Sequence, residues 1–139
     1  MKKSTELWLR KAEGDSRSTR KEIQGDDANY DAVCSHAQQC IEKWMKGILN
    51  EHSVPFPKTH DLEKLLTLLI PLYPSAAAIE PDVVRLNELA FDVRYPIEFA
   101  MLPEAQESLA ICEKARTFFV SIFSQENTPL FDSLSQKNG

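Results

Sequence analysis

The stretch from about Ala28 to Glu51 constrains the fold more than any other part of the sequence. Its apolar residues recur at intervals of four and three positions, at Tyr30, Cys34, Ala37, Ile41, Trp44 and Ile48. Residues at these intervals lie on one face of an α-helix, whereas a strand alternates every second residue. At about 1.5 Å per residue, such a helix is long enough to form the spine of a bundle. We expect its outer, solvated face to carry Ser35, Gln39, Glu42, Lys43 and Lys46.

Thinner apolar stripes, interrupted by glycine and proline, predict four further helices. These span about 4–23, 60–72, 81–95 and 103–123. We expect the first to pack on one neighbour only, because its stripe is narrow. Thr59 suits the N-cap of the third, and Pro81 suits the first position of the fourth.

The composition is that of a globular helical protein. Hydrophobic residues make up 42% of the 139 residues and charged residues 27%, with only 4 glycines, too few for a turn-rich β protein. We therefore expect one all-α domain in residues 1–124, an up-and-down bundle of four to five helices. Residues 125–139, rich in Ser, Gln and Asn, are expected to form a flexible tail.

The net charge of −5 argues against a free-standing duplex DNA binder, which normally neutralises phosphates with a basic face. Any basic site must be local. Cys34, Cys40 and Cys112 lack CxxC spacing and lie in helical apolar patterns, so we expect reduced, buried thiols. The first residues lack a signal-peptide core, and no apolar run approaches a membrane span. A cytoplasmic location is therefore expected.

Three segments carry a family resemblance. They are "WLRKAEGDSRSTRKEI" at 8–23, "YDAVCSHAQQCIEKWMKGILNEHSVPFPKTHDL" at 30–62 and "LNELAFDVRYP" at 86–96. In order and spacing they closely resemble the HEPN domain family of bacteria and archaea. The resemblance implies a helical bundle that pairs as a homodimer. It also implies a partner, since many bacterial members form toxin–antitoxin pairs with a small nucleotidyltransferase.

A subset of the family resembled here are metal-independent ribonucleases, whose signature is an Arg followed four to six residues later by a His. Arg neutralises the scissile phosphate, and His moves the 2′-hydroxyl proton. Arg94 is the best match for the Arg, but the positions beyond it hold Glu98, Phe99, Ala100 and Met101. Because the signature is not found, we expect a binding module rather than an enzyme.

Arg94 and Tyr95 are candidates for a phosphate clamp with a ring for base stacking. Alternatively, Arg94 caps helix carbonyls or pairs with Asp92 or Glu98. His60, in the "KTHDL" connection, could meet Arg94 and rebuild an acid–base pair, or could simply hold its loop.

His36, Lys43 and Lys46 could line a positive strip that contacts a nucleotide or RNA, or form a solvated face or a dimer contact. His52 is expected to be an ordinary surface residue. No HExxH pattern, Gly-rich phosphate loop or close histidine spacing occurs, so neither a metal nor a cofactor is expected.

Three hypotheses follow. The first is a dimerising module that binds a nucleotide or RNA and a nucleotidyltransferase, which could modify the hydroxyl of Tyr95. The second is a ribonuclease with His60 as its acid–base group. The third is a structural dimer adaptor that uses apolar residues such as Phe91 and Phe99.

Overall fold

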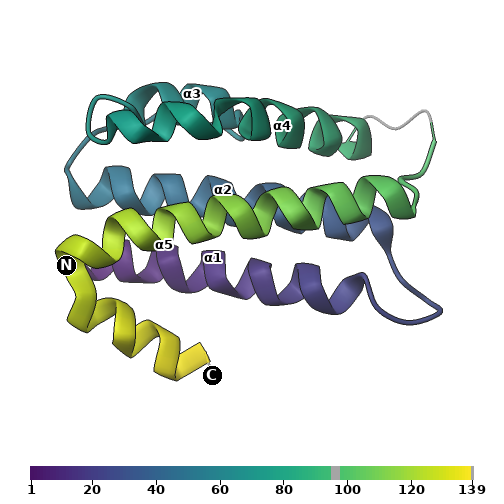
Figure 1. The fold of residues 1–139 in the computed structure, drawn as a ribbon, viewed down its shortest axis with the longest axis horizontal. Coiled ribbons are helices and arrows are strands. Elements are labelled where there is room, and N and C mark those ends of the chain that lie inside the picture. The colour runs from purple at the N-terminus through teal and green to yellow at the C-terminus, as the bar shows by residue number, and fades with distance from the viewer. Residues whose placement is uncertain (95–97, 139) are drawn as a thin grey trace.

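The computed structural model describes the backbone of residues 1–94 and 98–138 and the side chains of residues 1–90 and 98–124. Its elements are α1 (Lys3–Glu22), α2 (Tyr30–Glu51), α3 (Leu62–Leu69), the 3-10 helix η1 (Pro74–Ile79), α4 (Glu80–Arg94) and α5 (Leu102–Asn138). No strand occurs among the described residues. The helices lie side by side along the long axis of the molecule (Figure 1). The expected all-helical bundle is confirmed.

The α2 helix is the spine of the bundle, as its periodicity predicts. Asn29 caps it by accepting a hydrogen bond from the amide of Ala32, with a donor–acceptor distance of 3.0 Å. The helix contacts α1, α3, α4 and α5. The five stripe residues from Cys34 onward are fully buried, and Trp44 stacks on Phe119 with 6.4 Å between ring centroids.

The prediction of a solvated outer face on α2 is wrong for two of its five residues. Glu42 and Lys46 are buried, and so is their neighbour Gln38. The reason is that other elements cover α2 on several sides, so its buried arc is wider than the apolar stripe. The expectation for α1 also needs correction, because α1 packs on α2 and additionally contacts α5.

The connections differ from the sequence expectations in detail. Asp61, not Thr59, caps α3 by accepting from the amide of Glu63, and Thr59 Oγ1 instead accepts from the amide of Asp61. The α3 helix is shorter than expected, and η1 leads into α4 with Pro81 in its first turn. The α5 helix continues past the expected end near Phe123 to Asn138. The flexibility of 125–139 stays a prediction.

The three cysteines are free and buried, which confirms their interpretation as small core residues. Ser108 Oγ lies 3.3 Å from the sulfur of Cys34 and so fixes α5 against α2. Within the described part of the chain, no helix has both the length and the apolar character needed to cross a membrane.

Candidate functional site

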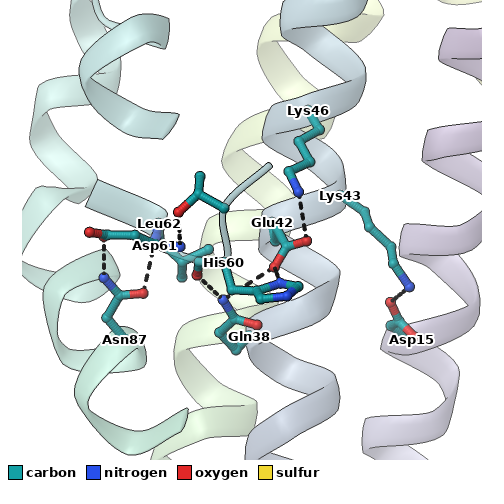
Figure 2. Close-up of polar contacts among 10 residues, drawn as sticks. Asp15, Gln38, Glu42, Lys43, Lys46, His60, Asp61, Leu62 and Asn87 are labelled. Carbon is teal, nitrogen blue, oxygen red and sulfur yellow. Dashed lines mark hydrogen bonds and ion pairs between the residues drawn. The ribbon is translucent and has the colours of Figure 1, made fainter. Parts of the chain in front are cut away.

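His60 is held against α2 with its ring exposed. The connection from α2 to α3 brings His60 Nδ1 within 2.8 Å of Glu42 Oε1, and the side-chain amide of Gln38 donates to the His60 carbonyl oxygen. Figure 2 shows both contacts on one side of the loop. The His60 side chain is nevertheless 69% exposed, whereas that of Glu42 is 6% exposed. A buried carboxylate therefore orients an imidazole that faces solvent.

Glu42 is itself held by a buried ion pair. Lys46 Nζ lies 3.0 Å from Glu42 Oε2, and the Lys46 side chain is only 8% exposed. The Lys46 ammonium lies 5.7 Å from the ring centroid of Trp8 and 5.9 Å from that of Phe56. Both distances suit a cation–π interaction. Burial of these two charges is tolerable because each pairs with the other.

The same loop is anchored on its other side by α4. Asn87 Oδ1 accepts from the amide of Leu62 at 3.0 Å, and Asn87 Nδ2 donates to Asp61 Oδ1 at 2.8 Å. Figure 2 shows Asn87 beside the start of α3, with its two contacts to Asp61 and Leu62. The backbone around His60 is thus fixed from α2 and from α4.

A hollow of about 220 Å³ lies beside His60, lined by Ser35, Gln38, Gln39, Glu42, Lys43, His60 and Ala90. Typical small-molecule pockets measure about 300–1,000 Å³, so this hollow suits one group of a larger ligand. The polar residues of its lining offer hydroxyl, amide and imidazole groups for hydrogen bonding.

Arg94 belongs to α4, the helix that contributes Ala90 to the lining of this hollow. It is the last residue of α4 and follows Ala90 by one helical turn. Its side chain lies outside the described residues, and so does the whole of Tyr95. The predicted meeting of Arg94 with His60, and the predicted roles of Arg94 and Tyr95 in binding, therefore stay predictions.

The expected positive strip along α2 is not a free basic surface. Lys43 Nζ lies 2.7 Å from Asp15 Oδ2 of α1, and in Figure 2 its side chain points away from Glu42. His36 Nδ1 lies 2.7 Å from Glu22 Oε2. Since Lys46 pairs with Glu42, each of the three bases has an acidic partner. Their contact with a ligand stays a prediction.

His36 and Phe99 line a second hollow, which shares Ser35 with the His60 hollow. This second hollow, of about 650 Å³, lies at the start of α2 and is also lined by residues 28–32 and Ala100. The side chain of Phe99 is 79% exposed, in keeping with the adaptor hypothesis. The side chain of Phe91, the other residue of that hypothesis, lies outside the described residues.

His52 is exposed, but it has a partner. Its Nε2 lies 2.9 Å from the hydroxyl oxygen of Tyr73, and the two rings meet edge to face. Among the residues with described side chains, no three His, Cys, Asp or Glu groups converge as metal ligands would.

The sequence did not predict that Gln38, Glu42 and Lys46 support His60, since it placed Glu42 and Lys46 on the outer face of α2 and gave Lys46 only a role in ligand contact. Gln38, Glu42 and Lys46 follow one another at intervals of four, which places them on successive turns of one helix face. That spacing was visible in the sequence, but a polar row on a helix is ordinarily solvated. This row is buried because the loop that carries His60 and the rings of Trp8 and Phe56 cover it.

The sequence was compared with family models, with curated proteins and with solved structures. A sequence model of the HEPN domain family matches residues 5–123, a stretch that includes Glu42, His60 and Asn87. Comparison with curated proteins and with solved structures gave no significant match. Since the matched stretch covers α1 to α4 and the first part of α5, well over half of the chain, the chain belongs to the HEPN domain family.

Proposed function

We propose that this chain is a homodimerising HEPN module that binds a nucleotide or RNA through the hollow beside His60. We further propose that it works with a nucleotidyltransferase in a toxin–antitoxin-type pair. Family membership supports the dimer and the partner. The single observation that supports the ligand site is His60, whose ring is exposed while its backbone and its Nδ1 are fixed by buried groups.

A fixed and exposed imidazole suits recognition of a nucleotide. Because Gln38 and Glu42 already hold the loop and ring, little conformational freedom is lost when a ligand binds. The ring can contact a ribose hydroxyl or a base edge, and Ser35 and Gln39 offer further hydrogen bonds at the same hollow. A single strand fits better than a duplex, since its sugars and bases are accessible.

The ligand test is a binding titration with a labelled single-stranded RNA oligonucleotide and, separately, with ATP. We expect His60→Ala to weaken binding about tenfold, the loss expected for a well-ordered hydrogen bond of about 1.4 kcal/mol. His52→Ala is the matched control, because His52 is also exposed but pairs with Tyr73 outside the hollow. Equal affinity of the His60→Ala variant and the wild-type chain would refute the site.

The partner test is co-expression with the product of the adjacent gene. We expect a nucleotidyltransferase to co-purify with this chain, and light scattering to give twice the chain mass for this chain alone. A monomer that forms no complex with that product would contradict both parts of the proposal.

Ribonuclease activity is the second candidate, and the Glu42–His60 contact favours it. A carboxylate that orients an imidazole is a recurring arrangement for proton transfer, with the distal ring nitrogen as the reacting atom. Arg94 would then supply the charge that neutralises the phosphate. RNA cleavage in the presence of EDTA, abolished by both His60→Ala and Arg94→Ala, would establish this function. Intact RNA at high protein concentration would exclude it.

A further inference from the structure

We propose that Glu42 is a positioning residue that fixes the tautomer of His60, so that the ring presents a hydrogen-bond acceptor to the ligand. The group this acceptor selects is a donor, and in a nucleic acid the donor that distinguishes RNA from DNA is the ribose 2′-hydroxyl. The choice of ligand group rests on the proposed function. The tautomer does not.

The tautomer follows from the contacts of Glu42. Its Oε2 accepts from the Lys46 ammonium, which has no acceptor capacity, and its Oε1 lies 2.8 Å from His60 Nδ1. A carboxylate paired with an ammonium only accepts hydrogen bonds, so the proton between Glu42 and His60 sits on Nδ1. In the neutral ring, Nε2 therefore carries a lone pair.

Further contacts hold the Glu42 carboxylate and its partner Lys46 in place. Gln38 Nε2 lies 3.5 Å from Glu42 Oε1 and also donates to the His60 carbonyl oxygen, which holds the carboxylate and the loop together. The Lys46 ammonium lies over the rings of Trp8 and Phe56. These two rings pack edge to face, with 6.2 Å between their centroids. The ammonium therefore cannot follow the carboxylate out into solvent without leaving both rings.

The tautomer determines which ligand groups can bind at one atom, His60 Nε2. Because Nδ1 faces Glu42 and the His60 side chain is 69% exposed beside the hollow, we infer that the lone pair on Nε2 is accessible to a ligand. A lone pair accepts a hydrogen bond from a hydroxyl, whereas an unprotonated phosphate oxygen offers no proton to it. A neutral His60 thus favours a ribose hydroxyl over a phosphate.

The first test is the ¹⁵N spectrum of the three histidine rings in the wild-type chain, with the His60 signals identified by their loss in His60→Gln. At a pH where the spectrum shows a neutral ring, we expect the proton on Nδ1 of His60. A proton on Nε2, or rapid averaging between both nitrogens, would overturn the proposal.

A substitution tests the cause. In Glu42→Gln, Lys46 binds the amide oxygen, so the amide nitrogen faces His60 and donates to Nδ1. We therefore expect the proton to move to Nε2, while His36, whose Nδ1 lies against Glu22, keeps its spectrum. If the folded variant kept the wild-type tautomer of His60, Glu42 would not be the residue that fixes it. Where Glu42→Gln fails to fold, the wild-type spectrum decides the question.

The ligand test compares a ribonucleotide oligomer with its 2′-deoxy counterpart. We expect the wild-type chain to bind the ribose form about threefold to tenfold more tightly, the range of one net hydrogen bond, and His60→Phe to lose the preference. Equal binding of both oligomers would refute the hydroxyl assignment and leave the proposed function standing. Binding of neither would refute the proposed function, while the tautomer is judged by its own spectrum.

Discussion

Arg116 of α5 donates two hydrogen bonds, each 2.7 Å long, to the carboxylate of Glu13 in α1. The Glu13 side chain is 8% exposed, so Arg116→Ala leaves a buried carboxylate without its counter-charge. Breaking such a pair costs about 3 kcal/mol of folding free energy. Urea unfolding of the variant measures this loss.

The control for Arg116 is Arg85, which also binds a glutamate through two hydrogen bonds, of 2.7 and 2.8 Å to Glu107. Here the two side chains are 42% and 41% exposed, and exposed pairs contribute about 0–1 kcal/mol. Equal losses in Arg116→Ala and Arg85→Ala would show that burial of Glu13 is not the cause.

Gly47 sits where α1 and α2 approach each other closely. A Cβ added there would lie 2.7 Å from Leu9 Cδ2 and 3.2 Å from Trp8 Cβ. Since Leu9 is fully buried and cannot easily give way, we expect Gly47→Ala to destabilise the fold by about 1–3 kcal/mol. The melting temperature should fall accordingly.

Gly14→Ala is the matched experiment within α1, because a Cβ there meets only the end of Arg17 at 3.7 Å. We expect it to stabilise the chain by about 0.5–1 kcal/mol through helix propensity. If both alanines raised the melting temperature, the close approach at Gly47 would be disproved.

Alkaline pH should weaken the fold through Cys40. The hydrogen bond with Cys112 and burial raise the pKa of the Cys40 thiol well above its ordinary value. The folded chain therefore keeps a proton that the unfolded chain releases near pH 8.5, so this stability is complete below that pH and declines as pH rises toward the folded pKa. We expect Cys40→Ala to flatten the decline above pH 8.5 in urea unfolding. An identical slope in both proteins would contradict this.

Asn87→Asp, which changes the residue that anchors the His60 loop, should make the stability of the fold depend on pH. The new carboxylate would take the place of the Asn87 amide that donates to Asp61 Oδ1 at 2.8 Å, and two carboxylates this close repel. The folded pair then binds a proton more readily than the unfolded chain, so destabilisation relative to wild type should grow as pH rises from about 4 to 7. Asn87→Ala removes the hydrogen bonds to Asp61 and Leu62 without adding charge, so its deficit should stay constant over that range.

The fold was largely predictable because apolar periodicity reports on burial. The stripe through Ile41, Trp44 and Ile48 and the breaks at glycine and proline predict the number, type and order of the α-helices. Capping was less predictable, since Thr59 and Asp61 both suit an N-cap and only backbone geometry selects Asp61.

The candidate site was less predictable, because charge usually signals exposure. Lys46 and Glu42 are interior residues whose burial depends on each other and on aromatic rings from two other segments. That arrangement joins Trp8, Phe56 and α2, residues far apart in the chain, and no local pattern encodes it. His60 was a candidate from its place in the connection, but its carboxylate partner came only from the structure.

The row formed by Gln38, Glu42 and Lys46 occupies consecutive turns of α2, the helix that contacts α1, α3, α4 and α5. The groups that aim the His60 ring are thus part of the interior that resists unfolding. Hydrogen exchange should therefore find the amides of these turns among the slowest in the chain.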